Sequence, residues 1–402
     1  MSKRPRLEVA EVIRSYGQAF RERYRPSPAQ SRVLRAITQC RTGVLGGHVQ
    51  GCDHCGELKI SYNSCRNRHC PKCQGSQTAQ WLEAQQPHLL PVPYFHVVFT
   101  LPQVLAPLAL QNPRVVYGLL FQAASRTLLE VAANPRHLGA KIGFLAVLHT
   151  WGQNLHHHPH IHCVVPAGGL SPDGSRWVSS SPHFFLPVRV LSRLFRGKFL
   201  ALLLQAFDDG RLRFHGSIAP LATRSAFLGL VSQARSTEWV VFAKRPFGGP
   251  ATVLKYLARY THRVAISNHR LQSIEDGRVS FRYKDYARGR RLRTMRLEAT
   301  EFIRRFLLHA LPKGFVRIRR YGLLANAQCA QRLAWCRQLL GSTKTVTDPA
   351  KNEPGDRSTG IAPYEPGVFR CPSCENGIMR RLHGRIPWAA LRPRPPPVPV
   401  SP

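Results

Sequence analysis

His156-His157-His158-Pro159-His160-Ile161-His162-Cys163-Val164-Val165 is the stretch from which the fold of this chain can be worked out. From His160 onward it is rich in apolar and β-branched residues and stops at Pro166-Ala167-Gly168-Gly169, so it predicts a β-strand. Residues 143–151 form another strand-like run just before it. Two such runs separated by a tight polar turn are typical of an antiparallel hairpin.

Regular segments continue on both sides of this hairpin. Residues 94–102, which end in Leu101-Pro102, predict a buried strand. Residues 104–133 and 186–207 carry apolar side chains at helical spacing and predict helices, as do residues 1–45. The chain therefore combines strands with long helices.

His160 and His162 are the first candidate site residues. Side chains at positions i and i+2 of a strand point to the same face, so the two imidazoles make half of a metal site. We expect Gln153, seven residues upstream across the turn, as the third ligand, with Asn154 and His157 as alternatives. Two imidazoles and an amide oxygen suit Mg²⁺ or Mn²⁺ and leave positions for phosphate oxygens. The competing interpretation is an exposed histidine-rich turn.

The second candidate site is a tyrosine-bearing segment at residues 254–263, which reads Leu-Lys-Tyr-Leu-Ala-Arg-Tyr-Thr-His-Arg. Its apolar residues have helical spacing, so Tyr256 and Tyr260, four residues apart, would share one helix face. A tyrosine hydroxyl can act as a nucleophile on a phosphodiester. The competing interpretation is that both tyrosines belong to a buried stripe. The cations that would steer phosphates are Lys255, Arg259 and Arg263.

A cysteine-rich region lies upstream. Cys52-x-x-Cys55 is followed, after 14 intervening residues, by Cys70-x-x-Cys73. Two such knuckles can present four thiolates to one tetrahedral Zn²⁺, so we expect a structural zinc ion on Cys52, Cys55, Cys70 and Cys73. The residues that could replace one of these ligands are Cys65, His54 and His69.

Two further features accompany the cysteines. Arg66 and Arg68 lie between the knuckles and would contact DNA, unless they belong to a merely solvated basic loop. A third knuckle, Cys371-x-x-Cys374, has no clear partner in the sequence. The candidates to complete a second zinc site there are Cys329, Cys336 and His383.

The charge of the chain indicates its partner. Its 402 residues carry 58 Lys+Arg against 21 Asp+Glu, a net charge of +37, which favours a polyanion such as nucleic acid. We expect no membrane partner, because we find no membrane span, no secretory signal and no lipidation motif. A cytoplasmic location follows, and there 11 cysteines favour metal binding over disulfides.

Five stretches together resemble a known family. The chain is similar to the HUH endonucleases, which include rolling-circle replication initiators and relaxases, and it more closely resembles the two-tyrosine rolling-circle transposases of the IS91-like family. The stretches that carry the resemblance are residues 40–48, 64–74, 158–169, 256–267 and 301–322.

The resemblance implies a fold and a set of roles. The fold would be α+β, with a central antiparallel sheet and flanking helices (the HUH core), preceded by a small zinc-binding domain and followed by a helical basic region. Tyr256 and Tyr260 would be the nucleophiles, and His160 and His162 would bind the catalytic ion. The protein would nick and join single-stranded DNA at transposon ends and targets through a 5′-phosphotyrosine.

Two other functions stay open at this point. One is a replication initiator or relaxase with the same chemistry, and the other is a non-catalytic zinc-ribbon protein that binds nucleic acid. The sequence also leaves open the DNA sequence recognised, the order of the two tyrosines and the protein partners.

The expected domain organisation has five parts. They are an N-terminal helical region (1–47), a zinc-binding domain (48–80), the HUH catalytic domain (90–290), a basic helical DNA-binding region (291–342) and a flexible proline-rich tail (343–402).

Overall fold

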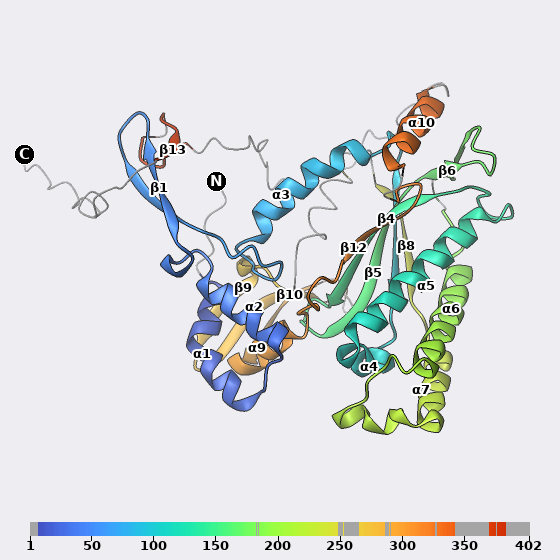
Figure 1. The fold of residues 1–402 in the computed structure, drawn as a ribbon, viewed down its shortest axis with the longest axis horizontal. Coiled ribbons are helices and arrows are strands. Elements are labelled where there is room, and N and C mark those ends of the chain that lie inside the picture. The colour runs from blue at the N-terminus through green and yellow to red at the C-terminus, as the bar shows by residue number, and fades with distance from the viewer. Residues whose placement is uncertain are drawn as a thin grey trace, which may run out of the picture.

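The structure is a computed structural model that describes residues 7–181, 183, 185–247, 252, 265–285, 289, 291–325, 328–341, 370–374 and 376–382. Within these residues the strands form four sheets, and every pairing between named strands is antiparallel (Figure 1). The fold is therefore α+β, as expected. Within the same ranges, no helix has both the length and the apolar character that a membrane span requires.

The largest sheet has five strands in the order β12-β4-β5-β3-β8. The hairpin predicted from the histidine-rich stretch is present at its centre as β4 and β5. The strands are β3 (Tyr94–Thr100), β4 (Gly143–Trp151), β5 (His157–Pro166), β8 (Val241–Phe247) and β12 (Ile318–Gly322).

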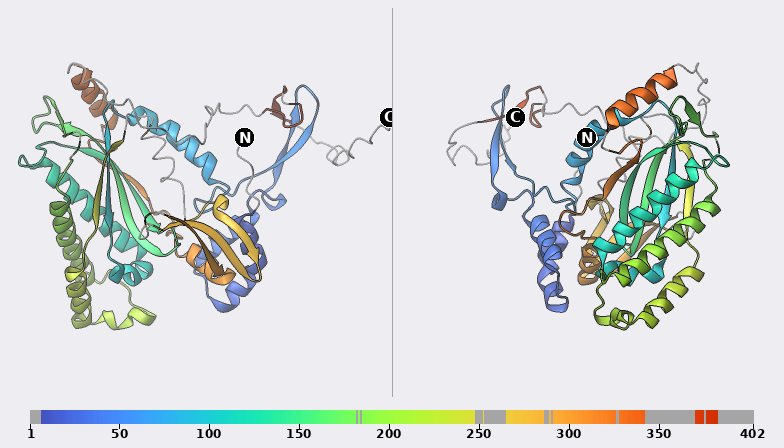
Figure 2. Two further views of the ribbon diagram at one scale, coloured as in Figure 1. Left: turned by 180° about the vertical axis from the view of Figure 1, so that it is seen from behind. Right: turned by 45° about the vertical axis from the view of Figure 1, so that its right-hand side comes forward.

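Helices cover both faces of this sheet, so β4 is buried from residue 143 to residue 150. Phe144 and Leu148 face a core formed with α4 (Ala106–Gln111), α5 (Pro113–Ala133), α6 (Val188–Asp208) and α7 (Arg224–Ser236). Leu145 and Val147 face a smaller core with α3 (Gln74–Gln85), α10 (Cys329–Gly341) and the hairpin of β6 (Gly168–Leu170) and β7 (Trp177–Ser179). Figure 2 shows the helices α5, α6 and α7 side by side on one face.

A second core joins segments from distant parts of the chain. Here the predicted helices near the N-terminus, α1 (Val9–Arg23) and α2 (Pro28–Gln39), pack with a three-stranded sheet and with α9 (Ala299–Leu307). The rings of Phe281 and Phe302 meet edge to face, with 5.8 Å between centroids. The strands of this sheet are β9 (Leu271–Glu275), β10 (Arg278–Asp285) and β11 (Arg291–Glu298).

The region expected to be helical and basic, residues 291–342, holds helices and strands. β11 and β12 are strands within it, alongside the helices α9 and α10. In β11, Met295 and Leu297 pack against the second core while Thr294 and Arg296 are exposed, which is the period of two of a half-buried strand.

The cysteine-rich region forms a separate small sheet. The strands β1 (Gly47–Cys52) and β2 (Leu58–Tyr62) make a hairpin, and β13 (Met379–Arg381) pairs with β1. Figure 1 and both panels of Figure 2 show this hairpin projecting away from the rest of the molecule. It is positioned by α2, which begins at a capping box between Ser27 and Gln30 and ends at Cys40.

Candidate active site

Three histidines meet on one face of the five-stranded sheet. His149 on β4 lies directly opposite His160 on β5, and His162 lies one step further along the same face. The ring centroids of His149 and His162 are 4.3 Å apart, and those of His160 and His162 are 4.8 Å apart. One nitrogen from each ring lies within 4.8 Å of the other two. These positions fit three imidazole ligands of one metal ion.

Hydrogen bonds leave one ring nitrogen of each strand histidine directed to the cluster. Nδ1 of His160 lies 2.7 Å from the carbonyl oxygen of His158, so Nδ1–H donates and Nε2 can coordinate. Nδ1 of His162 lies 2.7 Å from Nε2 of His96 on β3, which likewise assigns Nε2 to the cluster. Metal-binding histidines commonly have such a partner on the second nitrogen, which fixes the tautomer.

Burial keeps His160, His162 and His96 in the neutral form, which is the form that binds metals. Burial lowers the pKa of His160 to about 4. Burial is the main cause that holds the pKa of His162 well below its ordinary value, and the neighbouring imidazoles lower it further. Burial also lowers the pKa of His96 to about 3.

Gln153, the expected third ligand, lies in the turn between β4 and β5, and its role as a ligand stays a prediction. Strand pairing adds a residue that was not expected, His149, to the cluster. The backbone carbonyl of Gln153 accepts a hydrogen bond from Arg270 at 2.5 Å. The physical reason is register, because partners in an antiparallel hairpin lie symmetrically about its turn. β5 begins at residue 157, so the turn is centred near residues 154 and 155, and position 149 falls opposite 160.

The two alternative ligands also have other partners. Asn154 Oδ1 accepts from the backbone N–H of His156 at 3.2 Å, within the turn. Nε2 of His157 lies 2.8 Å from the hydroxyl of Tyr117, on the opposite face of the sheet. His149 and His96 were not predicted from the sequence. The signal for His149 was a histidine in a buried strand, at the position symmetric with His160.

The tyrosine segment lies outside the residues that the structure describes. This applies to Tyr256, Tyr260, Lys255, Arg259 and Arg263, whose roles stay predictions.

Within the described residues the cysteines form two clusters, and neither has the expected set of ligands. The first holds Cys40, Cys65, Cys70 and Cys73, with 3.5 Å between the sulfurs of Cys40 and Cys73. The second holds Cys52, Cys55, Cys371 and Cys374. The expected set of Cys52, Cys55, Cys70 and Cys73 is thus wrong as a single site. Cys52 ends β1 at the tip of the hairpin, whereas Cys70 follows β2 at its base.

A buried polar network joins the first cysteine cluster to the hairpin of β4 and β5, which carries the histidine cluster and is called the catalytic hairpin below for its proposed role. The N–H of Leu311 donates to Nε2 of His69 at 3.2 Å, next to Cys70. Two residues before Leu311, His309 donates from Nε2 to the carbonyl of Leu155 at 3.1 Å and accepts at Nδ1 from Thr150 at 3.2 Å. Burial lowers the pKa of His309 to about 3. Both of its hydrogen bonds are consistent with the neutral ring.

The two predicted cations of the cysteine-rich loop differ in their surroundings. Arg66 is exposed, with its backbone in the left-handed region at φ 50°. Arg68 donates to the carbonyl of Phe315 at 2.7 Å, and burial lowers its pKa. Arg68 therefore links this loop to the chain after α9, and Arg66 is the better placed of the two to meet a phosphate.

Comparisons with known proteins match two parts of the chain to transposase families. Residues 12–101 match a family profile described as "Transposase zinc-binding domain", of the IS91 type, and residues 143–332 match one described as "Putative transposase". The first matched range contains the first cysteine cluster together with Cys52 and Cys55, and supports structural zinc. The second contains the three histidines of the sheet.

Two relatives cover most of the chain. It is 55% identical over 377 residues to "Putative transposase y4qJ" of Sinorhizobium fredii, which spans 92% of this chain and 94% of the relative. It is 33% identical over 305 residues to the transposase for insertion sequence element IS801 of Pseudomonas savastanoi pv. phaseolicola, which spans 75% of this chain and 72% of the relative. No solved structure matches the chain.

Proposed function

The chain belongs to the IS91-like family of transposases, and from this premise we propose that it nicks and joins single-stranded DNA at transposon ends by tyrosine attack. The observation that carries the proposal is the cluster of His149, His160 and His162 on one face of the central sheet. The reaction would take place in the cytoplasm, on DNA of the nucleoid.

The chain's own residues would divide the work as follows. The three imidazoles would hold a divalent ion, Mn²⁺ or Mg²⁺, and that ion would supply the positive charge that polarises the scissile phosphate and stabilises the leaving oxygen. The hydroxyl of Tyr256 or Tyr260 loses its proton and its oxygen bonds to phosphorus. The bond from phosphorus to the 3′ oxygen breaks, and that oxygen takes up a proton, giving a 5′-phosphotyrosine and a free 3′-OH. The reverse step joins strands without ATP, because the phosphodiester energy is kept.

The third imidazole bears on which ion is preferred. An amide oxygen in that position suits Mg²⁺, whereas an all-nitrogen set favours first-row transition metals. We therefore expect faster cleavage with Mn²⁺ than with Mg²⁺ at equal concentration.

The proposed DNA-contacting surface is one face of the three-stranded sheet. It is formed by β11, which lies within residues 291–342, and by its neighbour β10. Val279 and Phe281 point into the second core, so the alternate residues of β10 point outward. The exposed cations on that outward face are Arg278, Arg282 and Lys284 on β10 and Arg296 on β11. Figure 2 (left) shows the sheet in front of the N-terminal helices. Such a row of cations fits a phosphate backbone.

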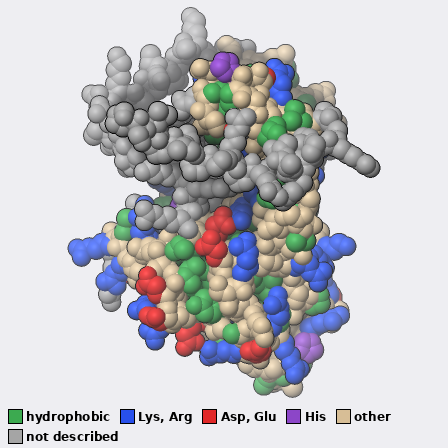
Figure 3. Space-filling model, turned by 90° about the vertical axis from the view of Figure 1, so that its left-hand side faces the viewer, with side chains coloured by type: hydrophobic (Ala, Val, Ile, Leu, Met, Phe, Trp, Pro, Cys, Tyr) green, Lys and Arg blue, Asp and Glu red, His purple; other side chains and the backbone are tan. Residues whose placement is uncertain are grey.

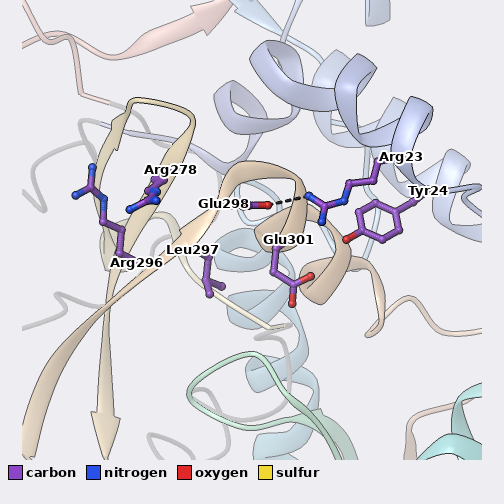
Figure 4. Close-up of a pocket in the computed structure, with 7 residues that line it drawn as sticks. All are labelled: Arg23, Tyr24, Arg278, Arg296, Leu297, Glu298 and Glu301. Atoms are coloured by element: carbon purple, nitrogen blue, oxygen red, sulfur yellow. Dashed lines mark hydrogen bonds and ion pairs between the residues drawn. The ribbon is translucent and has the colours of Figure 1, made fainter.

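One end of this sheet is hollowed. A pocket of about 400 Å³ lies beside Arg278 and Arg296, and Arg23, paired with Glu298 at 2.8 Å, closes its other side (Figure 4). Figure 4 shows Arg278 and Arg296 side by side on neighbouring strands. Lysine and arginine side chains are also spread over the lower half of the face drawn in Figure 3.

The test is covalent capture on single-stranded DNA that carries a transposon end. With Mn²⁺ or Mg²⁺ present, we expect a protein–DNA adduct whose labelled peptide maps by mass to Tyr256 or Tyr260. The double variant Tyr256→Phe with Tyr260→Phe should bind the DNA but form no adduct. An adduct formed by this double variant would overturn the assignment of the nucleophiles.

The metal site has its own matched pair of variants. His149→Ala should lower the cleavage rate by about 100-fold or more, because it removes a ligand of the ion that polarises the phosphate. Gln153→Ala should stay within about twofold of wild type, since among the described residues the hydrogen bond of Gln153 is made by its backbone carbonyl, which alanine keeps. The reverse order of effects would return the third position to Gln153.

A further inference from the structure

We propose that Cys52, Cys55, Cys371 and Cys374 bind a second zinc ion, which fastens the C-terminal segment to the N-terminal hairpin. Two of these ligands lie beyond residues 12–101, the range that matches the zinc-binding family. The proposal does not depend on the strand-cleavage chemistry, because its readout is metal content.

The sulfur positions fit tetrahedral zinc. Zinc–sulfur bonds of about 2.3 Å place the sulfurs of a tetrahedral site about 3.8 Å apart. The sulfurs of Cys52 and Cys374 are 3.7 Å apart, and those of Cys55 and Cys371 are 3.6 Å apart. All four lie within 4.8 Å of one another, and none is in a disulfide. The first cluster, inside the matched zinc-binding region, shows the same spacing, 3.5 Å between Cys40 and Cys73.

Backbone N–H groups are already directed at these sulfurs. The N–H groups of His54 and Cys55 each lie 3.4 Å from the sulfur of Cys52. The N–H of Ser373 lies 3.4 Å from the sulfur of Cys371. Donors around a sulfur stabilise its thiolate form, which is the form that binds zinc.

The two halves of the site are held in register by contacts that do not involve sulfur. Cys52 pairs with Met379 in the ladder of β1 and β13. The carboxylate of Asp53 accepts from the N–H of Ile378 at 2.7 Å and from Arg380 at 3.0 Å. The knuckle that carries Cys371 and Cys374 is therefore oriented towards the hairpin.

Gly377 shows how closely the two knuckles approach. A Cβ atom at this position would lie 2.2 Å from the sulfur of Cys52 and 2.7 Å from Cβ of His54. No side chain fits there, so the turn after Cys374 requires glycine.

The apolar core around the site is too small to hold the segment by itself. Within the described residues it consists of Cys52, Cys371 and Met379, with Cys374 packed against it. Small units without a sufficient core generally need a metal or a disulfide to be stable. With free cysteines at zinc spacing, a metal ion would add the stability that this small core does not supply.

The test counts zinc ions in the full-length protein after gel filtration, by plasma mass spectrometry. We expect two per chain for wild type. The double variant Cys371→Ser with Cys374→Ser should hold one, and so should Cys52→Ser with Cys55→Ser. The quadruple variant should also hold one, because both pairs bind the same ion. The zinc that remains shows that the first cluster is still folded.

Matched controls use cysteines outside both clusters. Cys329→Ala with Cys336→Ala should keep two zinc ions, since these residues of α10 are buried in a separate core.

Gly377→Ala should release one zinc to a chelator several times faster than wild type. One zinc per wild-type chain, two in the Cys371 and Cys374 variant, or none in the quadruple variant would each overturn the proposal.

Discussion

The two clusters each consist of four cysteines, but they lie in different surroundings. Cys40, Cys70 and Cys73 of the first cluster belong to the second hydrophobic core, beside α1, α2 and α9. The second cluster lies at the tip of the projecting hairpin, in a core of its own. A zinc ion at the first position would thus organise residues that also position the catalytic hairpin, whereas one at the second would hold only a peripheral segment.

The largest expected difference between the clusters is in stability. Cys70→Ser should lower the free energy of unfolding by at least about 3 kcal/mol, because it removes a structural metal from a packed core. The double variant Cys371→Ser with Cys374→Ser should cost less than about 1 kcal/mol globally and leave strand cleavage intact. Thermal midpoints from calorimetry and cleavage rates measured side by side test this. Equal losses in the two variants would erase the distinction between the clusters.

DNA affinity should distinguish the same two regions. The sheet of β9, β10 and β11 packs on the core of the first cluster, and its outward arginines are proposed to meet phosphates. Arg278→Ala with Arg296→Ala should weaken DNA binding about tenfold, or about 1.4 kcal/mol. The slope of log binding constant against log salt concentration should become shallower by about one to two, because fewer counterions are released.

The matched control removes two charges from the other region. Lys59 and Arg381 are exposed on the small sheet beside the second cluster. Lys59→Ala with Arg381→Ala should change affinity by less than about twofold. If this control weakens binding as much as the arginine pair, the DNA surface extends to the projecting hairpin. Fluorescence anisotropy at several salt concentrations measures both variants.

The smallest expected effect concerns the network between the first cluster and the catalytic hairpin. The pKa of His309 is lowered to about 3 in the folded state, while an unfolded histidine titrates near about 6.5. As the pH falls below the unfolded value, the unfolded chain gains a proton that folded His309 does not take up. Stability is therefore full above about pH 7 and should fall by about 1 kcal/mol between about pH 7.5 and 6 through this group.

His309→Gln is the variant that tests this effect. Its thermal midpoint should fall less than that of wild type over the same pH interval. His157, whose ring stacks at 6.4 Å from that of His309, and His69 remain in both proteins, as do the zinc thiolates. The comparison of slopes thus isolates His309. Equal slopes would show that it does not carry this pH dependence.

Local patterns predicted the parts of the site that lie within one strand or one turn. The alternation of His160, Ile161 and His162 correctly predicts two imidazoles on one face, with Ile161 buried on the other. The Cys-x-x-Cys spacings correctly predict cysteine knuckles. These features depend on backbone geometry over three or four residues, which the sequence specifies directly.

Partners across the fold could not be predicted in this way. The third histidine depended on where the turn between β4 and β5 is centred. β5 begins at residue 157, three residues before the expected start, and the pairing that results places His149 opposite His160. His96 depended on β3 pairing with β5, a contact between residues 66 positions apart.

The histidine-rich stretch and the +37 charge were thus sufficient to predict a sheet, a metal-binding face and a polyanionic partner. Only the tertiary structure decided which knuckles join. Cys52 lies 322 positions before Cys374, yet their sulfurs are 3.7 Å apart, because β13 pairs with β1 rather than with a neighbour in sequence. Spacing within a motif is set by covalent geometry, whereas pairing between motifs is set by long-range packing and strand register.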